Sequence, residues 1–298
     1  MKTVRLKKRK IKISPFEIIC FLCLVIYALS LLYMYFWGVI TSLKTNFDFR
    51  HNLFGLPQGN IWEWQWNNYV VAFNEVKVQV GARYVYLFEM LFNSFLYSFL
   101  GAFISVFCTW MVSYVCAKFK CKFSSVLYKT VIVFMIVPIV GSLPSSLKIY
   151  RDILNLYDNW FYVVISSIGI NGANMMIFYG FFLGVGDAYA EAAKIDGANN
   201  WQIMLRIMFP ITRQMFLILF INAFIPRWND YMACVIWIPS IPTLAYGIYK
   251  FKDATNNVAN WPPLQIAACV LLMIPMLAAF IALKDKFMGN IRIGGIKG

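Results

Sequence analysis

Six long apolar segments constrain the fold of this chain more than any other feature of its sequence. They cover residues 16–40, 90–117, 130–147, 159–186, 214–238 and 264–283. A helix that crosses about 30 Å of hydrocarbon needs roughly 20 mostly apolar residues. Because backbone N–H and C=O groups cannot stay unpaired in lipid, each segment is expected to be helical. The sequence therefore predicts an all-α polytopic membrane protein with six transmembrane helices.

The composition supports a membrane environment. Hydrophobic residues make up 61% of the 298 residues and charged residues only 13%, whereas soluble domains carry about 25% charged residues. The first apolar segment, residues 16–40, contains only Glu17 as a charged residue and exceeds the apolar region of a secretory signal. It is predicted to be an uncleaved anchor helix.

The positive charge of the chain indicates its orientation in the membrane. The net charge is +14, and eighteen Lys or Arg residues fall in segments on one side of the six predicted helices, against eight on the other. The positive-inside rule then places the basic N-terminus, residues 1–15, and the tail, residues 284–298, on the cytoplasmic side of a plasma (inner) membrane. No basic patch interleaves with exposed aromatic residues, so nucleic acid is not an expected partner. Membrane lipid is the partner that the apolar segments predict.

Catalytic and metal-binding chemistry have little basis in the sequence. His51 is the only histidine, and Cys20-x-x-Cys23 has metal-ligand spacing but lies in an apolar run without a second pair. No nucleophile–base constellation is evident. We predict no metal site and no enzymatic activity.

The segment of residues 41–88 is the longest predicted extracytoplasmic loop. It contains Trp62, Trp64 and Trp66. These residues fit an aromatic belt at the membrane surface, and they equally fit contact with an external partner protein.

A predicted cytoplasmic loop, residues 187–212, has the pattern of two short helices. Asp187 is a candidate N-cap, and Gly197 can adopt the left-handed conformation that ends a helix. Asn199 and Gln202 resemble a capping box that opens a second helix, which Pro210 is predicted to end.

The second predicted helix carries an apolar stripe on one face, formed by Ile203, Met204, Ile207 and Met208. Such a stripe can lie on lipid headgroups, pack on the chain's own helices or dock into a partner. Periodicity does not decide among these alternatives.

The same loop resembles the "EAA" loop of ABC importer permeases. The shared elements are Glu191-Ala192-Ala193, Gly197, Ile207 and Phe209-Pro210, with Phe209 where that family usually has leucine. The resemblance implies a coupling helix that inserts into a cleft of a cytoplasmic ATPase. Glu191 would make polar contacts with that ATPase, and Gly197 would allow the sharp turn of the loop. The coupling residues that it implies are Glu191, Ala192, Ala193, Asp196, Gly197, Ile207 and Pro210.

Further features are similar to carbohydrate permeases of the maltose-permease type: Asn93-Ser94, Trp228-Asn229-Asp230 and the tail at residues 294–298. The resemblance covers roughly residues 85–298 and implies the ABC type I importer permease fold. It also implies a second permease subunit in a heterodimer, two ATPase subunits and an extracytoplasmic solute-binding protein, with the tail reaching toward the ATPases. The sequence has no Walker-A pattern, so Mg-ATP would be bound by the partners and no cofactor by this chain.

Charged residues at membrane depth form the remaining candidate site. Arg227 and Asp230 are three residues apart and are predicted to share a helix face. They fit a structural ion pair or part of a translocation path. Candidate path residues are Asn93, Tyr179, Asn222, Trp228, Asn229 and Asp230.

These observations predict a permease subunit of an ABC importer for a carbohydrate, specifically an oligosaccharide, that works by alternating access. The alternative is an ion-coupled secondary transporter or channel without ATPase subunits. Inverted repeats would favour that alternative, and none is evident in the sequence.

Overall fold

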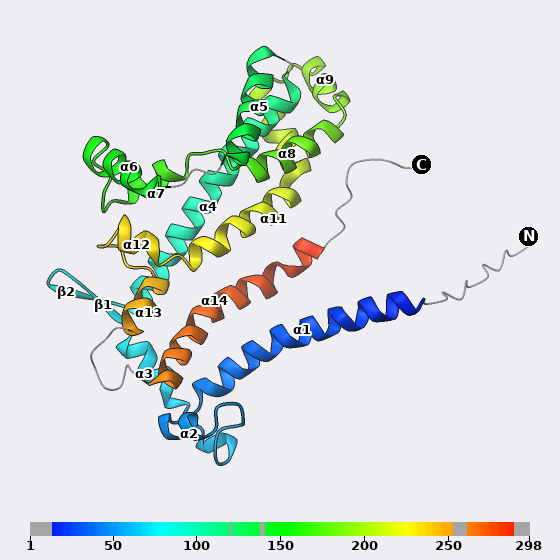
Figure 1. The fold of residues 1–298 in the computed structure, drawn as a ribbon. Coiled ribbons are helices and arrows are strands. Elements are labelled where there is room, and N and C mark those ends of the chain that lie inside the picture. The colour runs from blue at the N-terminus through cyan, green and yellow to red at the C-terminus, as the bar shows by residue number, and fades with distance from the viewer. Residues whose placement is uncertain (1–13, 120, 138–140, 253–260, 289–298) are drawn as a thin grey trace, which may run out of the picture. The chain divides into compact units, whose positions relative to one another are not determined.

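The computed structural model describes residues 14–119, 121–137, 141–252 and 261–288, and these residues are mostly helical (Figure 1). They form two compact units. One holds the described residues up to Ala72 together with Trp261–Val270, and the other holds the remainder. The helical prediction is therefore confirmed.

The first unit is built on the long helix α1 (Pro15–Ser42). A capping box opens α1, because Ser14 and Glu17 each accept the other's backbone N–H. Its most apolar window has a mean hydropathy of 2.4, and none of that window is buried. Only the last turn of α1 is buried, at Ile40, Thr41 and Ser42.

A small ordered segment follows α1 in the same unit. It contains α2 (Asn46–His51), the 3₁₀ turn η1 (Ile61–Glu63) and the start of α3 (Asn67–Glu75). Lys44 is 1% exposed and donates to the carbonyl oxygens of Asn52 and Leu53. Burial lowers the pKa of Lys44, and the carboxylate of Asp48 opposes that shift. The predicted loop is therefore a folded segment.

The second unit begins with a hairpin that the sequence did not reveal. Strands β1 (Lys77–Val80) and β2 (Arg83–Tyr86) are antiparallel, with Val80 opposite Arg83. Gly81 takes a positive φ of 59° in the two-residue turn between them. Six elements lie between the hairpin and the loop of residues 187–212: α4 (Leu87–Lys118), α5 (Lys122–Ile136), α6 (Leu143–Leu147), the π-helix η2 (Lys148–Ile153), α7 (Trp160–Ser167) and α8 (Gly172–Gly184). Two short helices come later in the chain, α12 (Met232–Ile236) and α13 (Leu244–Lys252).

The loop contributes α9 (Ala188–Ile195), α10 (Asn200–Gln202) and the π-helix η3 (Ile203–Met208), which lead into α11 (Phe209–Trp228). The last helix, α14 (Pro262–Met288), begins in the first unit and continues in the second.

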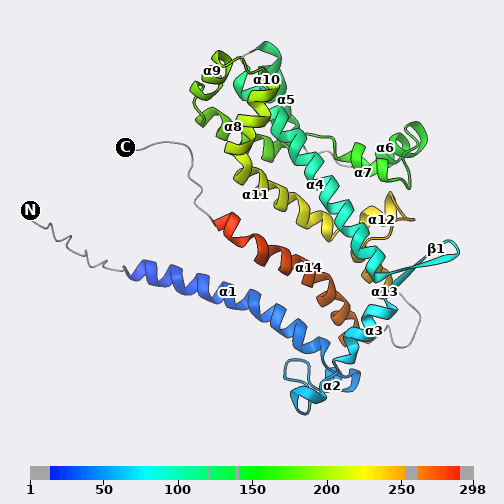
Figure 2. The same ribbon diagram turned by 180° about the vertical axis from the view of Figure 1, so that it is seen from behind.

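Helix α4 is the centre of the second unit and packs against α8 and α11 (Figures 1 and 2). Trp110 on α4 is fully buried and donates its indole N–H to Thr212 Oγ1 on α11, at 2.9 Å. Stacked rings of Phe95, Phe99 and Phe103 run along α4 beside the phenylalanines of α11. Close packing and interhelical hydrogen bonds hold membrane helices together, because lipid supplies no hydrophobic drive between them.

Three predicted spans are corrected by the structure. Residues 130–147 are not one helix, because α5 ends at Ile136 and α6 starts at Leu143. Residues 159–186 form the pair α7 and α8, bent by 52°, because Asn171 accepts the N–H of Asn174 and so starts a new helix. The fifth helix begins before residue 214 and ends at Trp228 rather than at residue 238. Among the described residues, four helices are long and apolar enough to cross a membrane, or five if the bent pair counts as one span.

Candidate functional site

The loop of residues 187–212, which the charge distribution predicts to be cytoplasmic, folds as a helix–turn–helix whose turn has the predicted geometry. Gly197 has a φ of +83°, in the left-handed region. Its N–H donates to Lys194 O at 3.1 Å, and the N–H of Ala198 donates to Ala193 O at 2.9 Å. These two bonds form the Schellman motif that ends α9. The capping box is also present, because Asn199 and Gln202 each accept the other's N–H.

Asp187 occupies the N-cap position of α9 but makes no capping hydrogen bond with its side chain. Its carboxylate instead accepts from Lys118 Nζ at 2.7 Å. Lys118 lies in the last turn of α4, its side chain is only 10% exposed, and it also donates to Val185 O. One buried ammonium group therefore ties the end of α4 to the entry of the loop, a link that the sequence did not suggest.

The prediction that Pro210 ends the second helix is wrong. The chain is helical from Asn200 through Trp228, so Pro210 lies in the first turn of α11. Pro210 has no N–H to donate to the preceding turn. The π-helix just before it uses wider bonds, such as Phe209 N–H to Met204 O.

The π-helix keeps one buried stripe in line across the joint. Met204, Met208, Thr212 and Phe216 are all buried and recur every four residues. In a regular helix of 3.6 residues per turn, such a stripe would rotate by about 40° per step. The wider π turn offsets this drift between Met204 and Met208, so the loop and α11 bury a continuous face.

The apolar stripe of the loop packs on the chain's own helices. Ile203, Met204 and Met208 are buried, and Ile207 packs partly buried beside them. They join a core formed with residues of α4, α8, α9 and α11: Val106, Trp110, Tyr114, Ala117, Phe178, Phe182, Val185, Ala193, Phe216 and Leu219. The sequence left three alternatives for the apolar stripe: lipid headgroups, the chain's own helices or a partner. For the buried residues, the structure selects packing on the chain's own helices.

A different set of apolar side chains faces outward from the loop. Ile195 is 87% exposed and Trp201 62% exposed, and Tyr189 and Leu205 are exposed as well. Glu191, Ala192, Asp196 and Gly197 are also exposed, whereas Ala193 is buried. Sequence periodicity missed the outward residues because it marks the apolar face of a helix without saying which part of that face is already covered.

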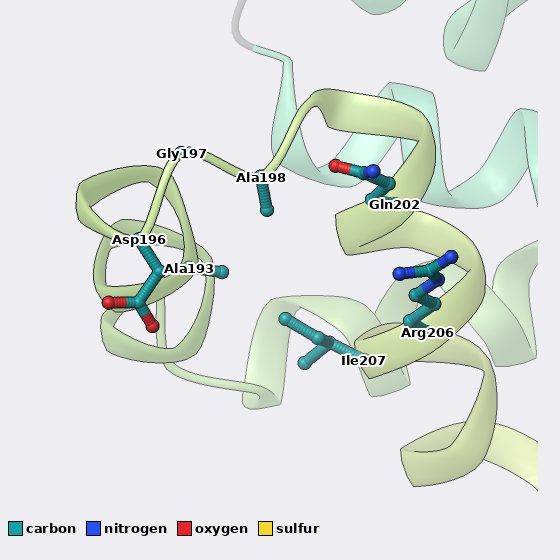
Figure 3. Close-up of a pocket in the computed structure, with 7 residues that line it drawn as sticks. All are labelled: Ala193, Asp196, Gly197, Ala198, Gln202, Arg206 and Ile207. Atoms are coloured by element: carbon teal, nitrogen blue, oxygen red, sulfur yellow. The ribbon is translucent and has the colours of Figure 1, made fainter.

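A notch of about 450 Å³ separates α9 from the second helix. Figure 3 shows Gln202, Arg206 and Ile207 extending from one wall of the notch toward Ala193, with Asp196 at its other side. A second hollow of about 300 Å³ is lined by Lys118, Glu191 and Lys194, among others. The loop thus combines an exposed apolar surface with concave polar features, as a protein-docking site requires.

The candidate path residues lie on several elements. Asn93 on α4 donates to Pro242 O, and Tyr179 on α8 stacks on Tyr128 of α5. Asn222 is exposed on α11, and Asn229 is exposed at the C-cap of α11. Trp228 is buried and donates to Leu272 O.

Arg227 and Asp230 do not form the predicted ion pair within the described residues. The reason is that α11 ends at Trp228, so Asp230 no longer shares its helix face. Asp230 accepts instead from the Tyr97 hydroxyl on α4 at 3.2 Å. Arg227 lies against Gly101 of α4, where an added methyl group would come within 2.5 Å of its Nε atom.

Metal ligation has no support in the described part of the chain, where no group of three His, Cys, Asp or Glu side chains is positioned to hold an ion. A chain that combines several membrane-length helices with an exposed loop of "EAA" spacing resembles the permease class of transport proteins.

Comparison with known proteins identifies the family. Residues 86–288 match the model of the family described as "Binding-protein-dependent transport system inner membrane component", and the chain belongs to this family. It is accordingly a multi-pass permease subunit of an ABC importer in the inner membrane, without catalytic activity of its own. This membership decides against the ion-coupled alternative.

Several relatives carry names of sugar transporters. The chain is 25% identical over 234 residues to the arabinooligosaccharides transport system permease protein AraQ of Bacillus subtilis, covering 78% of this chain and 79% of AraQ. It is 24% identical over 191 residues to the melibiose/raffinose/stachyose import permease protein MelC of the same organism, and this match covers 63% of this chain and 68% of MelC. An ABC transporter permease protein of Pyrococcus horikoshii is 28% identical over 164 residues, and this match spans 55% of the chain and only 57% of that relative.

A solved structure confirms the fold. It is the crystal structure of a bacterial ABC transporter involved in the import of the acidic polysaccharide alginate. Its matching chain has a TM-score of 0.71 and 20% sequence identity, covering 92% of this chain and 96% of that one. At this identity, the likeness concerns the fold.

Proposed function

We propose that this chain is one of two permease subunits of an ABC importer for a carbohydrate, specifically an oligosaccharide. The observation that carries the proposal is the outward face of the loop, mounted rigidly on α4 and α11. The names of the relatives AraQ and MelC support a sugar as the substrate. A similar permease would complete a heterodimer, and an extracytoplasmic solute-binding protein would deliver the sugar.

The loop would couple this chain to two cytoplasmic ATPase subunits that bind Mg-ATP. Glu191, Ala192, Asp196 and Gly197 are exposed where a partner can reach them. Ala193 and Ile207 would act from within, by holding α9 and the second helix together. Pro210 is exposed in the first turn of α11 and would act through the helix geometry at that joint. The exposed apolar residues Tyr189, Ile195, Trp201 and Leu205 extend the coupling set that the motif implied.

Transport would proceed by alternating access. Closure of the ATPases would draw the loop along with them, and the rod formed by η3 and α11 would carry that displacement into the membrane. Lys118 would pass the same displacement to α4. No cofactor on this chain is needed for this mechanism.

Six crossings with both termini in the cytoplasm fit the distribution of Lys and Arg. The crossing beyond α1, α4, the α7–α8 pair, α11 and α14 would include α5, whose 15 residues extend over about 22 Å and so cover only part of the hydrocarbon layer. Asn222 is exposed on α11, and Asn229 is exposed at its C-cap, where its amide donates to Ile225 O. An exposed amide is costly in lipid, so we assign the surface around Asn222 to a water-filled path or to the second permease subunit.

A first test of the coupling role is Glu191→Ala. We expect uptake of the sugar to fall at least about tenfold, while membrane insertion is unchanged. The measurement is oligosaccharide uptake by cells that express the complete transporter, with the chain quantified in isolated membranes. Asp152→Ala removes another exposed carboxylate, far from the loop in sequence, and serves as the control. Uptake at the wild-type rate in the Glu191 variant would refute the coupling role.

A second test concerns the exposed apolar face of the loop. Ile195→Asp puts a charge where we expect a buried contact, so ATPase binding should weaken by at least about 30-fold, or about 2 kcal/mol. The measurement is recovery of ATPase subunits with the detergent-solubilised permease. Ile195→Val keeps the apolar contact and should bind normally. Equal recovery with both variants would exclude Ile195 from the interface.

The substrate class is tested with the reconstituted transporter and its binding protein. Oligosaccharides should stimulate ATP hydrolysis and enter the vesicles. If amino acids or inorganic ions did so and a panel of oligosaccharides did not, the carbohydrate assignment would be wrong.

A further inference from the structure

The folded segment of residues 43–69, which we call the juxtamembrane knob, has an unusually apolar outer surface. It follows α1 directly, and both belong to the same unit. Phe54 is 71% exposed and Trp62 is 93% exposed. Five more large apolar side chains are exposed on the knob: Phe47, Leu53, Leu56, Ile61 and Trp66.

The knob folds back along α1 instead of extending away from its end. The indole N–H of Trp37 donates to Leu53 O at 3.0 Å. Trp37 lies five residues before the end of α1 at Ser42, a distance of about 7 Å along the axis at 1.5 Å per residue. The chain around Leu53 and Phe54 therefore lies beside the last turns of the helix, next to which Figures 1 and 2 show α2 and the following loop.

The length of α1 places these turns at a membrane surface. Its 28 residues extend over about 42 Å, whereas the hydrocarbon layer is about 30 Å thick. The end of α1 thus reaches the headgroup region, and a segment that turns back beside it meets the boundary between headgroups and acyl chains.

The knob also hides much of its charge. Lys44 and Asp48 are buried, so only Arg50 and Glu63 of its four Lys, Arg, Asp and Glu residues are exposed. The indole N–H groups of Trp64 and Trp66 donate to backbone carbonyls within the knob. Such a surface loses few polar contacts with water when it enters an interface.

The knob is held rigid by bonds to the end of α1. Gln65 N–H donates to Leu43 O, and the Asn68 amide donates to Ser42 O and Lys44 O. A rigid attachment means that the depth of the knob fixes the depth of the helix.

We propose that the juxtamembrane knob is a lipid-binding surface that rests in the bilayer interface at the C-terminal end of α1. It would set the depth and rotation of α1, whose most apolar window makes no buried contact. Of the two alternatives for this aromatic segment, the geometry favours lipid over an external protein, because the exposed rings adjoin a helix that stands in the membrane. The proposal depends neither on the sugar nor on the ATPase.

The experiment places an indole probe on the knob with Phe54→Trp. The complete transporter is reconstituted in vesicles of phosphatidylcholine, either plain or with bromine near the carbonyl end of the acyl chains. The chain has 10 tryptophans, so the wild-type spectrum is subtracted to isolate the added emission. The matched control is Tyr189→Trp, which replaces an aromatic side chain in the loop that we assign to the ATPase contact and not to lipid.

We expect brominated lipid to reduce the emission added by Phe54→Trp to roughly half or less, and to leave that added by Tyr189→Trp unchanged. If the added emission were unchanged by brominated lipid and were quenched by iodide in the water, the proposal would be overturned. Shielding from iodide by added binding protein would instead identify an external protein as the occupant and would also overturn it. If Phe54→Trp does not assemble, Trp62→Phe provides the same comparison, because it should remove a bromine-sensitive part of the wild-type emission.

Discussion

Replacing Gly197 with valine is expected to reduce uptake at least about tenfold, while the chain still inserts into the membrane. Gly197 ends α9 with a φ of +83°, and an L-residue in this region costs about 1–2 kcal/mol, more when it is β-branched. No atom lies within 4 Å of the position that a Cβ at Gly197 would take. The substitution therefore strains the backbone without a steric clash, and the strain falls on the joint between α9 and the second helix.

The control for this prediction is Gly186→Val in the same loop. Gly186 also has open space around its Cβ position, but its φ is not in the left-handed region. Uptake should remain close to wild type. Gly197→Asn should give an intermediate rate, because asparagine tolerates the left-handed region better than valine. If both valine variants transported equally well, the turn geometry would not matter for coupling.

Replacing Lys118 with methionine is expected to uncouple transport from ATP hydrolysis. Methionine keeps most of the side-chain volume but removes the ammonium group that bonds to Val185 O and Asp187. A hydrogen bond to a charged group contributes about 1.5–3 kcal/mol, and the half-exposed Asp187 lowers its own share. Without this tie, the loop moves with the ATPases while α4 lags, so sugar transported per ATP should fall at least about fivefold.

The measurement is uptake and ATP hydrolysis on the same vesicles, so that a loss of assembly is separated from a loss of coupling. Lys118→Arg should restore a large part of the ratio, because arginine can donate to the same acceptors. Lys122→Met removes an exposed charge just beyond the end of α4 and should leave the ratio unchanged. An unaltered ratio in Lys118→Met, at normal ATPase recovery, would show that Lys118 serves only to stabilise the fold.

Gly197 and Lys118 lie at different ends of the proposed coupling element. Gly197 sets how α9 meets the second helix, and Lys118 sets how the loop meets α4. Between them, the π-helix continues directly into α11. Under the proposed function, a force applied at the exposed face of the loop would therefore reach both α4 and α11.

The sequence by itself determined the features that depend on local chemistry. Long apolar runs require helices in lipid, so α1, α4 and α14 were predictable in place. The turn at Gly197 and the capping box of Asn199 and Gln202 were predictable for the same reason, because each depends only on residues a few positions apart. The "EAA" spacing indicated the family through the identity and order of its residues alone.

The tertiary structure alone decided which faces are covered and where helices bend or end. Ile203 and Met208 have the same apolar character as Ile195 and Trp201, yet the former are buried and the latter are exposed. The distinction arises because α4 and α8, distant in sequence, cover only one side of the loop. The Lys118–Asp187 pair and the Tyr97–Asp230 bond likewise join residues far apart in the chain. No periodicity encodes such partners, because they are fixed by packing between helices and not by the helices themselves.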